Sequence, residues 1–538
     1  MTRRTYVPLA LVALALAPAA AAAQSQPAPE SPAPPETGLP RKHAPEPTTA
    51  AITAGDLMTR LYIFADDSMR GREAGTEGNV KGTDYIAHEI EAMGLEPAGE
   101  DGSYFQTIPL KTRTLQESSS LSADGKALAL GDDWAPLGQR PVEETSLQVV
   151  YGGMAGDTAH AISADAATGK LVVYGVPEGA SLSSLFRGRP GPETAAAVAV
   201  AGLDELPPRF RGFLTRPRTF LDEGQESSGE GPELLLVSSG AAEALLGAAP
   251  QGLEPGAAGG TAALRVDFDV QPVPYPARNV VGIVRGSDPE LAGEYVAVGA
   301  HDDHLGVGRP VDHDSIRIFN RVVRPEGADD GGKQPTAAQQ SEVDSVLAAY
   351  RKTHDDRMDS VYNGADDDGS GSVTALEIAQ ALQAMDPHPK RSILFVWHVG
   401  EEKGLLGSRW FTDHPTVPRD SIVAQLNMDM IGRGDTSDET GRTKFGTPFH
   451  GDARYLQLVG SRRLSTELGD LIERVNRADG HDLLFDYSMD TNGHPSNIYC
   501  RSDHYEYARY GIPIAFFTTG LHADYHQVTD EPEYIDYD

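Results

Sequence analysis

The sequence predicts an α/β protein with a mixed, largely parallel central sheet flanked by helices, and a smaller β-rich domain inserted into it. Three observations favour this class. Apolar runs of strand length alternate with helix-forming stretches, which is typical of parallel βα units. Polar residues stand directly after several of these runs, where the sites of open α/β sheets lie. Between about 121 and 270 the chain instead shows short β-like runs separated by loops rich in Gly, Pro and Ala.

The N-terminus predicts export. In residues 1–23, Arg3 and Arg4 precede an apolar segment, and the small residues Ala21, Ala22 and Ala23 form a cleavage site. The segment is too weakly apolar for a lasting membrane helix, so we expect a mature protein in the periplasm or outside the cell. The twin-arginine and general export routes both stay open.

Composition sets the remaining boundaries. The length of 538 residues indicates two or three domains. Residues 24–50 carry eight prolines and are expected to form an extended, disordered linker. We assign 51–120 and 271–538 to the main domain and 121–270 to the insert. The insert has one histidine, His160, and no cluster of ligand-type residues, so we expect it to hold no metal.

The charge and the cysteine count exclude some functions. A formal charge of −34 argues against nucleic acid as a partner, because nucleic acid requires a basic surface. The single cysteine, Cys500, allows neither an internal disulfide nor a cysteine-rich zinc site. Any metal must therefore be held by His, Asp and Glu side chains.

The main domain shows helix and strand signals in order. Thr53 is expected to cap a helix, and Gly94 is expected to end another that begins near Thr76. Further helices are expected at 337–352 and 373–385. The expected strands of the main domain are 279–285, 295–300, 391–396, 422–428 and 514–518. The expected strands of the insert are 147–151, 170–174, 196–200 and 233–237.

Chemistry-bearing side chains follow these apolar runs. Each one alone has an ordinary explanation as a buried histidine, a solvated acid or a turn cap. At the carboxyl ends of strands in one sheet they could instead converge. Two histidines and three carboxylates suffice for two metal ions if one carboxylate bridges them. The side chains that could converge in this way are those of His301, Asp367, Glu401, Glu402, Asp429 and His526.

The acidic stretch at 362–377 allows two sharper interpretations beside a plain helix cap. Asp366, Asp368 and Glu377 match ligand positions one, three and twelve of an EF-hand calcium loop. Alternatively, the stretch supplies one ligand of a two-metal site, and Asp367 lies between the metals. The second interpretation requires further ligands elsewhere in the chain.

These segments resemble the M28 metallopeptidases, whose zinc aminopeptidases carry two metals. The resemblance covers about 55–110 and 275–536. The insert is similar to a protease-associated domain in its place in the chain and in its short β-like runs separated by loops. Residues 305–360 are longer than the resemblance implies, so we expect this segment to reshape the rim of the site. The matching motifs are GREAGT at 71–76, GAHDDH at 299–304, NGADDDGSG at 363–371, GEEKGLLGS at 400–408, NMDMIG at 427–432 and DYHQVTD at 524–530.

The resemblance implies a role for each matched residue. His301 and Asp429 would bind one metal, Glu402 and His526 would bind the other, and Asp367 would bridge them. Glu401 would be the general base, Asp303 would orient His301, and Tyr525 would help to hold the oxyanion.

The implied function is hydrolysis of the N-terminal peptide bond of peptides with a free N-terminus. The implied cofactors are two divalent metal ions, and Zn²⁺ is the metal we expect. The alternatives are another activity of this family, carboxypeptidase or glutaminyl cyclase, and a calcium-binding protein without enzymatic activity. The oligomeric state, the metal identity and the preferred N-terminal residue stay open.

Overall fold

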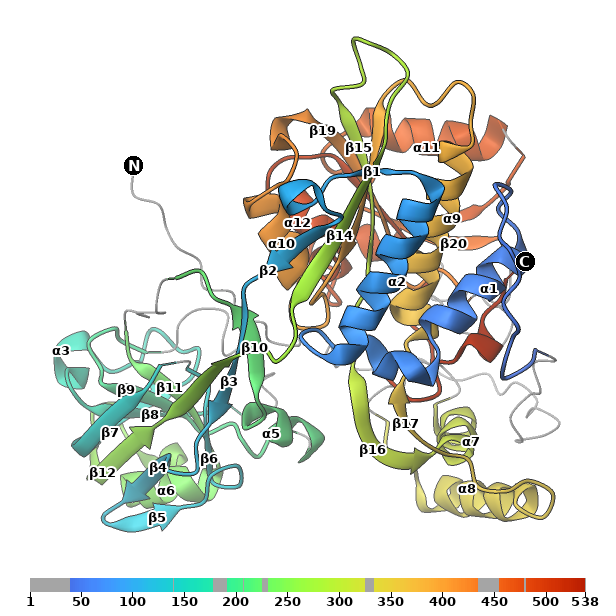
Figure 1. Ribbon diagram of the computed structural model, residues 1–538. Helices are drawn as coiled ribbons and strands as arrows, with labels where there is room; N and C mark the ends of the chain where they lie inside the picture. The colour runs from blue at the N-terminus through green and yellow to red at the C-terminus, as the bar shows by residue number, and fades with distance from the viewer. Residues whose placement is uncertain are drawn as a thin grey trace. The chain divides into compact units, whose positions relative to one another are not determined.

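The structure is a computed structural model that describes residues 39–138, 140–177, 191–206, 208–224, 231–324, 333–433, 454–478 and 480–537. It divides into two compact units. One unit comprises residues 109–272, and the other comprises 39–108 together with 273–537 (Figure 1). The signal peptide expected at 1–23 lies outside the described residues.

The larger unit is built on a mixed nine-stranded sheet. Strands β18, β15, β19 and β22 are mutually parallel and central, whereas the pairings β14 with β18 and β22 with β20 are antiparallel. The prediction of a mixed α/β sheet is therefore confirmed. In spatial order the strands are β1 (Glu96–Pro97), β14 (Ala277–Val284), β18 (Ser392–His398), β15 (Tyr295–His301), β19 (Ile422–Met428), β22 (Ile514–Thr518), β20 (Tyr455–Val459) and β21 (Leu484–Asp486), and β2 (Phe105–Ile108) also pairs with β14.

Helices cover both faces of this sheet (Figure 1). On one face α1 (Ala54–Phe64), α2 (Glu77–Met93) and α9 (Gly371–Gln383) pack over Phe395 and Trp397. On the other face α10 (Leu406–Asp413) and α12 (His504–Ala508) pack over Leu394 and Val396. Since β18 is buried on both sides, its sequence is a continuous apolar run. Helix α11 (Thr466–Ala478) also belongs to this unit.

The predicted helix ends agree with the structure. The Thr53 side chain accepts the backbone N–H of Asp56 at 3.1 Å and caps α1. Gly94 ends α2 in the left-handed conformation, which a glycine adopts without steric cost.

The segment between β15 and α9 forms a separate excursion of the larger unit (Figure 1). Strands β16 (Gly306–Asp312) and β17 (Met358–Tyr362) pair as antiparallel partners. Helices α7 (His313–Val323) and α8 (Ala337–Tyr350) lie between them in sequence and share an apolar cluster. We predicted α8 but not α7 or the strand pair.

The smaller unit is β-rich, as expected. In the described part of this unit, an eight-stranded sheet and a three-stranded sheet, together with short helices, surround two apolar clusters. The four strands expected in the insert correspond to β7, β8, β9 and β11. The elements are β3 (Leu110–Leu115), β4 (Ser120–Ala123), β5 (Lys126–Leu128), β6 (Trp134–Pro136), β7 (Val142–Met154), α3 (Ala164–Ala167), β8 (Leu171–Gly175), β9 (Ala197–Val200), α5 (Pro208–Leu214), β10 (Arg218–Leu221), β11 (Glu233–Val237), α6 (Ser239–Leu246), β12 (Ala258–Val266) and β13 (Phe268–Pro272).

The end of the proline-rich segment differs from expectation. Residues 39–50 have no regular helix or strand, yet they contact α1. The Tyr62 hydroxyl donates to the Pro40 carbonyl at 2.5 Å, and Thr49 Oγ1 donates to Asp56 at 2.9 Å. Prolines lose little conformational freedom when a chain is ordered, so few contacts suffice to hold this segment. Within the residues described, no helix is both long and apolar enough to cross a membrane.

Candidate metal centre

Parallel strands bring the predicted residues to one edge of the large sheet. His301 ends β15, and Asp429 follows β19 directly. Glu401 and Glu402 lie three and four residues beyond the end of β18, and His526 lies on the loop after β22. Because these four strands are parallel, their carboxyl ends meet at this edge.

Asp367 lies between two histidines. Its Oδ1 is 3.1 Å from His301 Nε2, and its Oδ2 is 3.1 Å from His526 Nε2. The side chain of Asp367 is almost completely buried. One carboxylate thus faces a histidine on each side, which is the arrangement that a bridging ligand requires.

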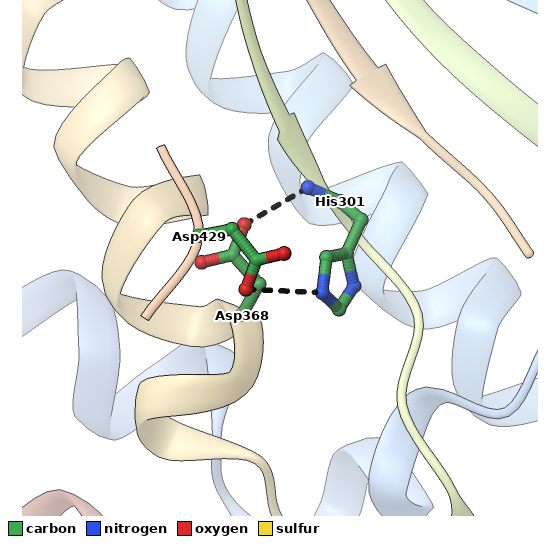
Figure 2. A group of neighbouring side chains, drawn as sticks. All are labelled: His301, Asp368 and Asp429. Atoms are coloured by element: carbon green, nitrogen blue, oxygen red, sulfur yellow. Dashed lines mark hydrogen bonds and ion pairs between the residues drawn. The ribbon is translucent and has the colours of Figure 1, made fainter. Parts of the chain in front are cut away.

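His301 and Asp429 form the first side of the centre. His301 Nε2 lies 3.7 Å from Asp429 Oδ1, and the Ser502 hydroxyl donates to Asp429 Oδ2 at 2.6 Å. Figure 2 shows that the Asp368 carboxylate also lies here, against the backbone nitrogen of His301. Asp368 also accepts the backbone N–H of Gly371 at 2.9 Å. His301, Asp368 and Asp429 are close enough to hold an ion together, but backbone donors already occupy Asp368.

Glu402 and His526 form the second side. Glu402 Oε2 lies 3.1 Å from His526 Nε2, and Glu402 Oε1 lies 2.7 Å from His304 Nδ1. His304 is fully buried, and its ring meets that of His526 edge to face at 5.8 Å. With Asp367 and Glu402, His304 makes a second group that could hold an ion. We did not predict His304 as a ligand.

The donor atoms of the centre fit divalent metal ions. Buried nitrogens and oxygens face one another here at 2.7–3.8 Å without a well-formed hydrogen bond among the described residues. Buried polar atoms normally have a partner, and metal ions bound on the two sides of the centre would supply one to those that face them. The atoms concerned are His301 Nε2, both ring nitrogens of His304, Asp367 Oδ2 and Glu402 Oε1.

The neighbours Glu401 and Glu402 have different environments. Burial raises the pKa of Glu401 well above its usual range, and the carboxylates of Asp429 and Glu402 add to this effect. Burial also opposes ionisation of Glu402, but His526 and His304 outweigh it and lower the pKa of Glu402. Adjacent carboxyl groups with opposite shifts are suited to different roles.

Tyr525 and Asp303 lie beside the metal-ligand candidates. The Tyr525 ring stacks on His526 at 3.8 Å, and burial together with the charges of Asp367 and Glu402 keeps the pKa of its hydroxyl well above the usual range. His301 Nδ1 lies 2.9 Å from the backbone carbonyl of Asp303 and 3.8 Å from its carboxylate. The hydrogen-bond contact to the imidazole therefore comes from the backbone, whereas we expected the carboxylate to orient His301.

Two further residues hold the Asp367 segment in place. The guanidinium of buried Arg72, in the motif at 71–76, donates to the carbonyls of Asn363 and Gly364 at 2.7 and 3.0 Å. Asp530 accepts the backbone N–H of Asp367 at 3.1 Å. Sequence reasoning assigned no role to either residue, because both act across more than 160 positions of the chain.

The EF-hand alternative does not match this geometry. Glu377 pairs with buried Arg60 on α1. Asp366 faces His522 Nε2 at 3.2 Å and accepts the backbone N–H of Gly432 at 2.7 Å. The carboxylates at loop positions one and twelve therefore have separate protein partners.

Comparisons with known proteins show which proteins the chain is similar to. The model of Peptidase family M28 matches residues 279–538. A probable leucine aminopeptidase from Arthroderma benhamiae is 42% identical over 77 residues, 14% of this chain and 22% of that protein. Leucine aminopeptidase 1 from Coccidioides posadasii is 34% identical over 160 residues, 28% of this chain and 36% of that protein. The chain thus spans only about a fifth to a third of the length of these relatives.

A solved structure also aligns with the chain. The aminopeptidase from Aneurinibacillus sp. strain AM-1 covers 90% of this chain and 90% of its own, with a TM-score of 0.48 and 15% sequence identity.

Proposed function

Because the model of peptidase family M28 matches residues 279–538, we propose that the protein is an exported two-metal aminopeptidase of this family. It would hydrolyse the N-terminal peptide bond of peptides that have a free N-terminus. The observation that carries the proposal is the position of Asp367 between His301 and His526, each 3.1 Å away.

The proposed metal ligands are those expected from the sequence. His301 and Asp429 would hold one divalent ion, Glu402 and His526 the other, and Asp367 would bridge them. Nitrogen and oxygen donors of this kind suit Zn²⁺. When bound, the two ions would polarise the substrate carbonyl and lower the pKa of the attacking water.

Glu401 is the proposed general base. Its carboxylate takes the proton of the attacking water and later delivers it to the leaving amine. Burial raises the pKa of its carboxyl group, which makes the carboxylate a stronger base toward the water proton. Tyr525 keeps its hydroxyl proton and can donate it in a hydrogen bond to the developing oxyanion.

The acidic character of the site supports a free N-terminus as the recognised group. Asp367, Glu401, Glu402 and Asp429 present carboxyl groups at one edge of the sheet, and a protonated or metal-bound amine is attracted there. A free C-terminal carboxylate would instead need a basic partner at the same place.

One peptide in three forms tests the reaction. We expect the purified protein with Zn²⁺ to release the first residue of the unmodified peptide and of the C-terminally amidated one, but not of the N-acetylated one. Cleavage of the N-acetylated but not the amidated form would indicate a carboxypeptidase. Release of ammonia from an N-terminal glutamine, without peptide cleavage, would indicate a cyclase.

Export is proposed from the N-terminal sequence. N-terminal sequencing of protein recovered outside the cytoplasm should begin near Gln24. A chain recovered there with Met1 at its start would contradict cleavage.

A further inference from the structure

Helix α7 of the excursion contacts the loop that carries Tyr525 and His526. Asn320 Nδ2 donates to the Ala523 carbonyl at 3.0 Å and to Gln527 Oε1 at 3.3 Å. Residues 523–527 are called the histidine loop below. The first and the last residue of this loop are therefore held by one side chain, which lies more than 200 positions earlier in the chain.

The backbone of the histidine loop needs such support. His526 has φ 59°, in the left-handed region that non-glycine residues rarely adopt. A conformation of this kind persists only where surrounding contacts enforce it. Within the loop, Gln527 N–H donates to the Asp524 carbonyl at 3.0 Å, and this bond closes a turn that contains Tyr525 and His526.

A second contact from α7 fixes the middle of the loop. Arg317 Nη1 donates to Asp524 Oδ2 at 3.1 Å, and Arg433 reaches the same oxygen at 3.3 Å. The other carboxylate oxygen accepts the Thr529 hydroxyl at 2.7 Å. Asp524 is buried, so these donors determine where it sits. The Arg317 guanidinium also lies over the ring of Tyr534, 3.5 Å from its centroid.

Helix α8 supports α7 in turn. Arg351, just after α8, pairs with Asp312 and with Asp314, the latter at 2.9 Å, at the start of α7. Val343 of α8 is buried with Ile318 of α7 in the shared apolar cluster. The two helices therefore form one body whose inner face ends on the histidine loop.

We propose that the helix pair α7–α8 is a clamp for the histidine loop, and that Arg317 and Asn320 are positioning residues for His526 and Tyr525. The link to metal binding rests on the proposed function. The hold on the loop does not, because it follows from the contacts of the protein alone. The excursion would thus complete the second side of the metal centre.

Hydrogen exchange of the metal-free full-length protein tests the clamp directly. The variants are Asn320→Leu, which keeps the size of the side chain but removes its amide, and Arg317→Met. The matched controls are Gln340→Leu, at an exposed position of α8 where the amide bonds to Asp344, and Arg309→Met, an exposed arginine of β16. We expect faster exchange at 523–527 in the first pair, and wild-type exchange in the controls.

Metal titration supplies the functional readout. Residues that orient ligands typically change metal affinity or activity by about 10- to 100-fold. Asn320→Leu should therefore lower the affinity for one of the two bound ions, Co²⁺ or Zn²⁺, by about 10-fold or more. The affinity for the other ion should stay near the wild-type value, and the melting temperature should not change. The absorption spectrum of bound Co²⁺ should change only for the ion whose affinity falls.

Two results would overturn the clamp. One is wild-type exchange at 523–527 in both Asn320→Leu and Arg317→Met. The other is that the matched controls lose as much protection from exchange at 523–527 as the two variants do. If exchange changes as expected but the wild-type protein cleaves no peptide, the clamp stands and the proposed function fails. If the wild-type protein cleaves peptides and the variants exchange normally, only the clamp fails.

Discussion

The carboxylate of Asp303 accepts the backbone N–H of Glu401 at 3.0 Å. The same oxygen accepts the backbone N–H of Gly400 at 2.7 Å. Asp303 thus joins two strand ends: its carbonyl contacts the His301 imidazole, and its carboxylate holds the turn that presents Glu401 and Glu402.

Two substitutions separate these roles of Asp303. Asparagine keeps an oxygen that can accept both N–H groups, whereas alanine leaves these buried donors without an acceptor. We expect Asp303→Asn to keep kcat within about 10-fold, and Asp303→Ala to lose about 10- to 100-fold. Similar large losses in both variants, measured on a peptide substrate, would show that the charge of Asp303 acts on His301.

Glu401 and Glu402 should respond differently to the same substitution. Glutamine at position 401 cannot accept the proton, and removal of a general base typically costs about 10²–10⁴ in rate. We expect Glu401→Gln to keep both metals and lose kcat with little change in KM. Glu402→Gln should weaken metal binding, and excess metal should restore part of the activity. If Glu401→Gln loses metal and Glu402→Gln keeps it, the roles assigned to the two residues are exchanged.

Much of the fold could be predicted because local signals agree with tertiary contacts. The apolar runs before His301 and Asp429 are buried strands, and the caps at Thr53 and Gly94 fix the helix ends. Once the strands are known to be parallel, convergence of their carboxyl ends follows. Four of the five metal-ligand candidates, all except Asp367, could therefore be proposed together, although each one is ambiguous alone.

Other residues gave no local signal. His304 was read as part of a motif, and its contact with Glu402 depends on the turn after β18. Asp530 and Arg72 act through backbone groups far away in the chain. Helix α7 has apolar residues at helical spacing but no capping hydrogen bond from the side chain of Asp312, so its beginning was not marked.

The contact of His304 with Glu402 leads to a metal-binding prediction. His304 offers a buried nitrogen on the Glu402 side only, so its removal should affect one ion of the two. We expect His304→Gln to weaken that ion by about 10-fold or more. Isothermal titration with Zn²⁺ measures both affinities in one experiment. Substitution of the exposed His160 by glutamine is the control, and unchanged binding in both variants would remove His304 from the ligand set.

Asp367 and Glu377 distinguish the bridged centre from an EF-hand loop. Asp367→Asn removes the charge shared by two histidines and should abolish both activity and tight metal binding. Glu377→Gln should keep the metals but lower stability, since Arg60 would lose a buried carboxylate partner. Metal analysis and thermal unfolding of both variants measure these effects. Metal loss in Glu377→Gln together with retention in Asp367→Asn would favour the calcium loop.

The last prediction concerns the smaller unit and the pH dependence of its stability. Glu233 is 1% exposed, and burial raises its pKa to about 7, against the opposing effect of Arg140. Below about pH 4.5 the carboxyl group is protonated in the folded and unfolded states alike, so it contributes nothing to the pH dependence. As the pH rises toward 7, the unfolded chain loses this proton while the folded chain keeps it, and stability falls.

Above pH 7 the loss from Glu233 is complete, at about 3 kcal/mol for a difference of roughly 2.5 pKa units. Glu233→Gln removes the titrating group, so we expect it to raise the melting temperature of this unit at pH 8 and to change it little at pH 4. Glu243→Gln, at an exposed position of α6, is the matched control. Calorimetry of the full chain at both pH values measures the effect. If Glu233→Gln leaves the difference between pH 4 and pH 8 as large as in the wild-type protein, Glu233 is ionised in the folded unit, and Arg140 outweighs its burial.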